Sequence, residues 1–165
     1  MSRDVRFNLP AGPVIAQESD GVVRARGIPY ATAARFARPV PVPPWAEPLR
    51  ADRPGPGSPQ ISSSLLAHVI GEHNDGLVAG EDCQRLSLTI PADRESGELL
   101  PVMVWFHGGS YTTGAGDLEV YSAPDLVREQ RVVVVSVTYG LGILGYLGLP
   151  GIAPANLGLL DQVAA

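Results

Sequence analysis

Two hydrophobic patterns run along the chain, and each predicts a different kind of strand. Hydrophobic and polar residues alternate near the N-terminus and again before Pro91, which is typical of strands with one buried face. The alternating segments are residues 5–9, 13–17, 22–26 and 86–90. A turn signal at Asp20-Gly21 separates the second and third segments, so we expect short antiparallel strands there. Residues 102–106 are continuously apolar, and residues 132–137 are apolar except for Ser136, so both runs predict strands buried on both faces.

Helical signals follow each of the two apolar runs. Residues 124–130 predict a helix, because Pro124 suits a first turn and Asp125 suits the positive end of the helix dipole. Asn156 is a candidate cap for a helix that continues through residue 162. A strand, helix, strand, helix succession with short links predicts parallel strands in an α/β layer architecture.

The remaining segments predict no second domain. Residues 37–60 are rich in proline but include Trp45 and other apolar groups, so we expect an ordered coil that crosses the surface. Residues 62–70 predict a short helix, and the polar residues 71–80 predict a loop. We therefore expect one domain over residues 1–165.

Composition narrows the possible partners. The formal net charge is −5 and basic residues form no cluster, which argues against nucleic acid or an anionic membrane as the main partner. Residues 132–160 carry no charge, but their glycines and prolines favour a strand and a loop over a membrane-spanning helix. Cys83 is the single cysteine, which excludes an internal disulfide and a cysteine-based zinc site. The N-terminus lacks an apolar signal segment, so we expect a cytoplasmic protein.

The candidate chemistry lies in the glycine turn that follows residues 102–106. Backbone N–H groups in such a turn can stabilise a developing oxyanion, and Gly108, Gly109 and Ser110 are the candidates. A tight turn whose glycines only satisfy backbone geometry is the alternative. Ser110 also lies in a near match to G-x-S-x-G, with Thr112 in place of the last glycine, but loop residues follow where a nucleophile elbow needs a helix.

Other motifs predict weaker sites. The segment from Gly140 to Gly145 fits G-x-G-x-x-G and follows a strand, so a nucleotide-binding domain is a second hypothesis. The residues after Gly145 do not favour a long helix, however, and Asp161 lies in a predicted helix and not at a strand end. The three histidines show no metal-ligand spacing, so we expect neither a metal nor a cofactor. We interpret His107 as a packed, hydrogen-bonded ring and Cys83 as a small buried group.

Six segments, in order and at sensible spacing, resemble the type-B carboxylesterases, which include cholinesterases and bacterial para-nitrobenzyl esterases. The segments are residues 26–31 (RGIPYA), 35–39 (RF-x-x-P), 81–88 (EDC-x-x-LSL), 102–111 (VMVWFHGGSY), 133–147 (VVVSVTYGLGILGYL) and 156–162 (NLGLLDQ). The resemblance implies the N-terminal part of an α/β-hydrolase fold, in which short antiparallel strands lead into a mostly parallel sheet. It also implies hydrolysis of small-molecule carboxylic esters without a cofactor.

The resemblance also assigns roles to individual residues. It places the oxyanion donors at Gly109 and Ser110, with Gly108 beside them, and it implies a salt bridge between Arg35 and Glu81. The chain departs from the family pattern in two places. Gly140 stands where the family has arginine, and Ser58 lies about where secreted members have the cysteine that would pair with Cys83.

The resemblance places the nucleophilic serine, the acid and the histidine of a catalytic triad after Ala165. The chain contains no G-x-S-x-G motif, so we expect residues 1–165 to be a fragment that is inactive alone. Residues 102–106 would then form an unpaired apolar edge, which invites contact with another strand. A catalytically inactive interaction module is the alternative function. The sequence predicts no oligomeric state.

Overall fold

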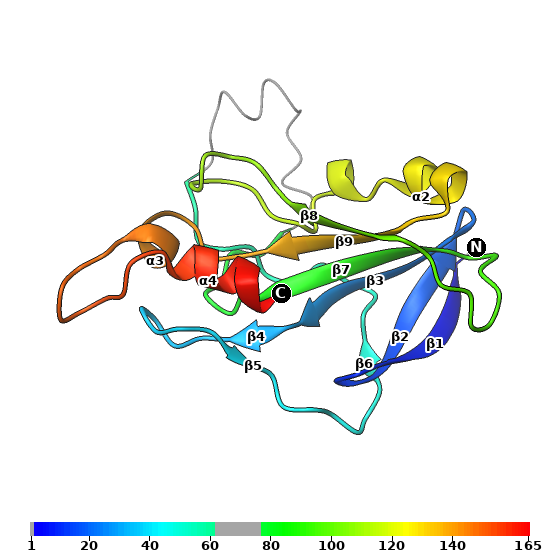
Figure 1. Ribbon diagram of the computed structural model, residues 1–165, viewed down its shortest axis with the longest axis horizontal. Helices are drawn as coiled ribbons and strands as arrows, with labels where there is room; N and C mark the ends of the chain where they lie inside the picture. The colour runs from blue at the N-terminus through cyan, green and yellow to red at the C-terminus, as the bar shows by residue number, and fades with distance from the viewer. Residues whose placement is uncertain (1, 62–76) are drawn as a thin grey trace.

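The computed structural model describes residues 2–61 and 77–165, which form a main sheet with strand order β1-β2-β3-β7-β9-β8 and with β6 beside β2 (Figure 1). The strands of this sheet are β1 (Arg3–Leu9), β2 (Gly12–Ser19), β3 (Val22–Pro29), β6 (Leu49–Arg50), β7 (Arg85–Pro91), β8 (Val102–Phe106) and β9 (Val133–Thr138). A smaller sheet pairs β4 (Ala31–Thr32) with β5 (Val40–Pro41). The helices are η1 (Glu119–Tyr121), α2 (Pro124–Gln130), α3 (Gly142–Tyr146) and α4 (Leu157–Ala164). The predicted helix over residues 62–70 and most of the loop after it lie outside the described residues.

The N-terminal strands pair antiparallel, as predicted. β1 pairs with β2 along its whole length, and β2 pairs with β3 across a two-residue turn. Asp20 and Gly21 have φ angles of 51° and 77°, which is the left-handed geometry of a tight hairpin turn. The proline-rich coil is ordered, because Trp45 donates its indole N–H to the Pro13 carbonyl at 2.9 Å and Ala51 is fully buried.

The sheet is mostly antiparallel in the described residues, which corrects the expectation of a mostly parallel one. β7 pairs antiparallel with both β3 and β9, while β8 pairs parallel with β9. A parallel pair needs a crossover of about a dozen residues or more. Helix α2 is part of such a crossover between β8 and β9, and the predicted strand–helix–strand unit is therefore confirmed. The link from β7 to β8 contains no helix, and β9 lies between these two strands.

β8 is an edge strand, so the prediction that residues 102–106 are buried on both faces is wrong. Among the described strands β8 pairs with β9 alone, and Val102 and Val104 are 61% and 50% exposed. β9 lies one position further in, and its Val134 and Val137 are buried. The two apolar runs look alike in sequence, but only the inner one has a neighbouring strand on both sides. The expected exposed apolar edge is thus confirmed.

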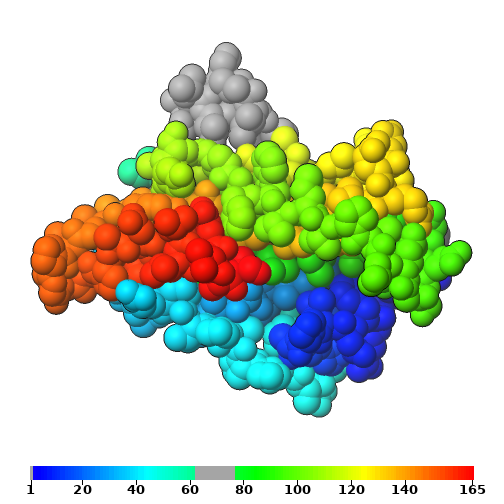
Figure 2. All heavy atoms as spheres, in the orientation of Figure 1, coloured from blue at the N-terminus to red at the C-terminus, as the bar shows by residue number. Residues whose placement is uncertain are grey.

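Two apolar clusters lie on the sheet. One lies along β2 and β3 and includes Val14, Ala25 and Ile28. The other joins Val127 of α2 to Val22 and Val134, so the crossover helix covers the sheet with its one buried side chain. Met103 of β8 also packs against the second cluster. The end of β8 and the loop that follows it, in light green, lie at the surface in Figure 2.

Candidate functional site

The glycine turn begins directly after β8 and exposes its backbone. Gly108 and Ser110 are exposed, and Gly109 is half-buried. The φ angles of Gly109, Ser110 and Tyr111 are 115°, 54° and 60°, so three consecutive residues leave the ordinary backbone regions. Within the described residues, the backbone N–H groups of Gly108, Gly109 and Ser110 donate no hydrogen bond. Among the described residues, these N–H groups therefore have no partner, and two of the three residues that carry them are exposed.

The carbonyl of Gly109 closes the turn. It accepts hydrogen bonds from the backbone N–H groups of Thr112 and Thr113 at 3.0 and 3.2 Å, and from the Thr112 hydroxyl at 3.0 Å. A Cβ atom at position 109 would lie 2.8 Å from the Thr113 carbonyl carbon and nearer still to its oxygen. Only glycine fits at this position, because both the φ angle and the space exclude a side chain.

The buried side chain of His107 contacts the turn. The ring is buried, and its Nδ1 lies 2.7 Å from the Gly108 carbonyl oxygen, which can only accept, so Nδ1 carries the proton. The ring stacks on Tyr139 at a centroid distance of 4.5 Å, and the Tyr139 hydroxyl donates to the His107 carbonyl at 2.7 Å. Burial lowers the pKa of His107, so the ring is neutral at pH 7. The prediction of a packed, hydrogen-bonded ring is confirmed.

Ser110 lies in a turn and not in a nucleophile elbow. The described residues that follow it form turns and loops up to η1, without the helix that an elbow needs. The nearest imidazole in sequence, His107, is buried and has its Nδ1–H committed to Gly108. Within the described residues, the surroundings of Ser110 therefore provide neither the helix of an elbow nor an accessible imidazole.

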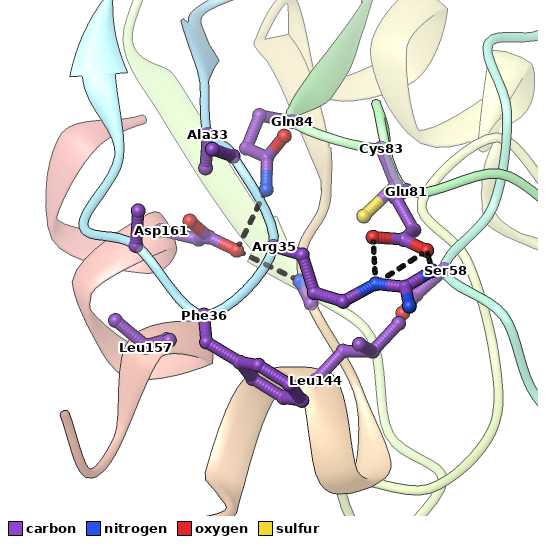
Figure 3. Close-up of a pocket in the computed structure, with 13 residues that line it drawn as sticks. Ala33, Arg35, Phe36, Ser58, Glu81, Cys83, Gln84, Leu144, Leu157 and Asp161 are labelled. Atoms are coloured by element: carbon purple, nitrogen blue, oxygen red, sulfur yellow. Dashed lines mark hydrogen bonds and ion pairs between the residues drawn. The ribbon is translucent and has the colours of Figure 1, made fainter. Parts of the chain in front are cut away.

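A second group of polar residues surrounds a small cavity of about 30 Å³, which lies between residues 33–37, residues 81–84, α3 and α4 (Figure 3). The predicted salt bridge lies at its rim, where Arg35 Nε is 2.9 Å from a Glu81 oxygen. Arg35 is 64% exposed, so solvent screens this pair and it contributes little to stability. The space is about that of one water molecule.

Asp161 of α4 is the buried acid of this cavity. It is 3% exposed, and its Oδ2 accepts hydrogen bonds from the Gly140 N–H at 2.9 Å and from the Gln84 amide at 3.2 Å. Burial raises the pKa of Asp161. A Cβ atom at position 140 would lie 3.0 Å from Oδ2. The residue that stands in place of the family's arginine is therefore a direct neighbour of Asp161, a pairing that the sequence did not reveal.

Cys83 is a buried thiol beside the same cavity, as predicted. It is 2% exposed, and burial raises its pKa to about 12. The neighbouring Ser58 is fully buried, and its hydroxyl accepts a hydrogen bond from the Leu141 N–H at 2.9 Å. Ser58 and Cys83 thus lie side by side, as the resemblance implies for the two positions.

The segment from Gly140 to Gly145 has a packing role in the structure. It leads into α3, which is five residues long. A Cβ atom on Gly145 would lie 2.5 Å from the Gly140 carbonyl carbon, and one on Gly158 would lie 2.8 Å from the Tyr146 ring. These glycines let α3 and α4 pack closely, which accounts for them without a bound phosphate.

Neither a metal-binding cluster nor a membrane-spanning helix occurs among the described residues. The described part of the chain contains no group of three or more His, Cys, Asp or Glu side chains arranged to hold a metal ion. Within residues 2–61 and 77–165, no helix has the length and apolar character needed to cross a bilayer.

Comparisons with known proteins match nearly the whole chain. The model of the "Carboxylesterase family" matches residues 12–165. The "Probable N-octanoylanthranilate hydrolase AqdA2" of Rhodococcus erythropolis is 45% identical over 157 residues, which cover 94% of this chain and 34% of that protein. Acetylcholinesterase of Bungarus fasciatus is 40% identical over 152 residues, covering 87% of this chain and 25% of that enzyme.

The fold comparison agrees with the sequence comparison. A thermophilic PNB esterase superimposes with a TM-score of 0.82 at 33% identity, covering 96% of this chain and 33% of that one. A second PNB esterase gives a TM-score of 0.80 at 34% identity. The predicted α/β-hydrolase fold class is therefore confirmed. The chain spans about a third or less of the length of the relatives it matches.

Proposed function

The chain belongs to the carboxylesterase family, and we propose that it supplies the oxyanion-hole segment of a hydrolase that cleaves small-molecule carboxylic esters. Because the chain spans about a third of its relatives, the activity belongs to the complete protein. The single observation that carries the proposal is the turn at Gly108, Gly109 and Ser110, whose N–H groups have no partner among the described residues.

Such a turn suits the chemistry of ester cleavage. When a nucleophile attacks an ester carbonyl, the carbonyl oxygen becomes negative, and N–H donors already in place stabilise it without reorganising. Removing one such donor commonly lowers kcat by about 10²–10³, or about 2.7–4 kcal/mol of barrier. In this chain the donors are the N–H groups of Gly109 and Ser110, with that of Gly108 beside them.

The remaining steps use groups outside these 165 residues. A serine hydroxyl attacks the carbonyl carbon and passes its proton to a histidine, which gives a tetrahedral intermediate held by the donors above. The histidine then protonates the alcohol as it leaves, and the acyl-enzyme is hydrolysed by water in the reverse sense. The role of the present segment is to hold the negative oxygen.

A second candidate function has support from the sheet edge. Val102 and Val104 of β8 are half or more exposed, and an apolar edge strand of this kind pairs readily with another strand. A catalytically inactive interaction module would use β8 in this way and would show no turnover in any context.

Ester hydrolysis by two forms of the protein separates the candidates. We expect the protein expressed from its complete gene to hydrolyse para-nitrophenyl esters, and residues 1–165 alone to show no rate above background. N-octanoylanthranilate, the compound named for one relative, belongs in the substrate panel. Absence of turnover by the complete protein would favour the interaction module. Turnover by residues 1–165 that is abolished by Ser110→Ala would instead make Ser110 the nucleophile and refute the proposed division of roles.

A further inference from the structure

Gln60 binds the far end of the glycine turn through its side-chain amide. Its Nε2–H donates to the Gly114 carbonyl at 2.9 Å, and its Oε1 accepts from the Gly114 N–H at 2.7 Å. The same Nε2 lies 3.1 Å from the Ser58 carbonyl. Gln60 therefore pairs with both backbone groups of a residue 54 positions away, as a neighbouring strand would.

Gly114 is packed directly against the start of the turn. Its φ angle is 111°, and a Cβ atom there would lie 2.8 Å from His107 Cε1, nearer still to His107 Nδ1, and 2.9 Å from the Gly108 carbonyl oxygen. Since the backbone of Gly114 touches His107 and Gly108, a shift at Gly114 is transmitted to the residue that precedes Gly109.

A second connection runs through the neighbouring residue. Thr113 precedes Gly114, and its N–H donates to the Gly109 carbonyl at 3.2 Å. The direction of the Gly109 carbonyl fixes the peptide plane that carries the Ser110 N–H, because carbonyl and N–H of one peptide bond are coplanar. Holding Gly114 in place therefore also fixes the direction of the Ser110 N–H.

Gln60 has no other evident structural task among the described residues. It is exposed, and no described apolar cluster includes it. An exposed glutamine loses rotamer freedom when its amide is fixed in three hydrogen bonds. The fixed amide serves the geometry of the turn and contributes little burial.

We propose that Gln60 is a positioning residue for the oxyanion donors, an inference that rests on the proposed ester hydrolysis. It acts through Gly114 on the turn and does not touch the substrate. Small misplacement of catalytic groups can lower kcat by about 10²-fold. We expect loss of the Gln60 amide to lower kcat by about 10–100-fold and to leave KM within about twofold, because the donors act on the transition state.

The experiment uses the complete protein with two substitutions and one matched control. Gln60→Ala removes all three hydrogen bonds. Gln60→Glu keeps an acceptor for the Gly114 N–H, but it puts a second carboxylate oxygen, which cannot donate, opposite the Gly114 carbonyl. Gln84→Ala removes a buried glutamine that donates to Asp161 at 3.2 Å, away from the turn, and tests for general destabilisation.

Two measurements are made on each variant. The first is kcat and KM for a para-nitrophenyl ester, normalised to folded protein. The second is hydrogen exchange of the Thr112 and Thr113 amides, which bond to Gly109 and not to Gln60. We expect both Gln60 variants to lose kcat and exchange these amides faster, and Gln84→Ala to lower the melting temperature without either change.

The outcomes distinguish failure of the inference from failure of the proposed function. Unchanged exchange of the two threonine amides in Gln60→Ala overturns the positioning role, and so does an equal loss of kcat in Gln84→Ala. If the unmodified complete protein hydrolyses no ester, the proposed function fails, while the exchange measurement still decides whether Gln60 holds the turn.

Discussion

Substituting alanine for Gly109 tests the oxyanion turn most directly. The new Cβ atom would lie 2.8 Å from the Thr113 carbonyl carbon, whereas ordinary contacts begin at about 3.4 Å. The turn must therefore open by at least about 0.6 Å, and the shorter approach to the Thr113 oxygen adds to this displacement. The φ angle of 115° independently disfavours any residue except glycine.

The displacement moves the backbone N–H groups that would bind the oxyanion. Opening the turn moves the Gly109 carbonyl from its threonine donors, and the Ser110 N–H moves with it. Loss of one backbone donor lowers kcat by about 10²–10³, so we expect Gly109→Ala to lower kcat of the complete protein by this factor. Strained backbone at one residue costs about 1–3 kcal/mol, which should also lower the free energy of unfolding.

Gly108→Ala is the matched control. Nothing lies within 4 Å of a Cβ atom at position 108, and the φ angle of Gly108 is not positive. We expect this variant to fold normally and to retain kcat within about tenfold, because the turn keeps its shape. The assay is steady-state hydrolysis of a para-nitrophenyl ester, with urea unfolding of both variants. Equal losses in the two variants, or full activity in Gly109→Ala, would refute the reasoning.

Two further predictions concern the cavity beside α4. Because burial raises the pKa of Cys83 to about 12, we expect its thiol to resist a disulfide reagent at pH 8 in the folded protein and to react in urea; rapid reaction of the folded form would contradict this. The raised pKa of Asp161 means that the folded state holds this proton more tightly than the unfolded state, so its contribution to stability is full below pH 3.8 and is lost as pH rises through the folded pKa. Asp161→Asn should therefore raise the urea midpoint at pH 7 but not below pH 3.8, and an equal shift at both values would contradict the argument.

Local features of the fold could be predicted from the sequence because their causes are local. Helix α2 has the bounds 124–130 that its proline and acidic first turn predicted. The Asp20-Gly21 turn has the left-handed angles that these residue types favour. Turn chemistry and capping act over a few residues, so one stretch of sequence contains the whole signal.

Strand environment could not be predicted in the same way, because it depends on partners far along the chain. Residues 102–106 and 132–137 have the same apolar pattern, yet β8 is an exposed edge and β9 is an inner strand. The antiparallel pairing of β7 with β9 likewise depends on the order of the strands in the sheet. A hydrophobic run indicates that a strand can be buried, and the position of the strand in the sheet decides whether it is buried.

Some residues of the candidate site could likewise be predicted from the sequence, and others could not. The turn at Gly108 and Gly109 has a sequence signature, because glycine is the residue that tolerates its backbone. Gln60 has none, since its amide binds the backbone of Gly114 and backbone groups are the same in every residue. The sequence predicts that Asp161 lies in a helix, but its neighbour Gly140 is 21 positions away and donates its backbone N–H, which leaves no sequence signal.

Two residues of the proposed site that are not glycine adopt backbone angles that favour glycine. Ser110 and Tyr111 both adopt positive φ angles, and both are exposed. Non-glycine residues in this region carry strain, and strain persists only where the surroundings hold it in place. Here Tyr111 is held by its carbonyl, which accepts the Gly142 N–H at 2.7 Å, and by its ring, whose centroid lies 4.7 Å from that of Tyr146. The Gly109 carbonyl with its threonine donors and the Gln60 amide on Gly114 hold the rest of the turn. A turn that only reversed the chain would be less strained with glycine at positions 110 and 111. The strained geometry is instead consistent with a turn that directs N–H groups outward.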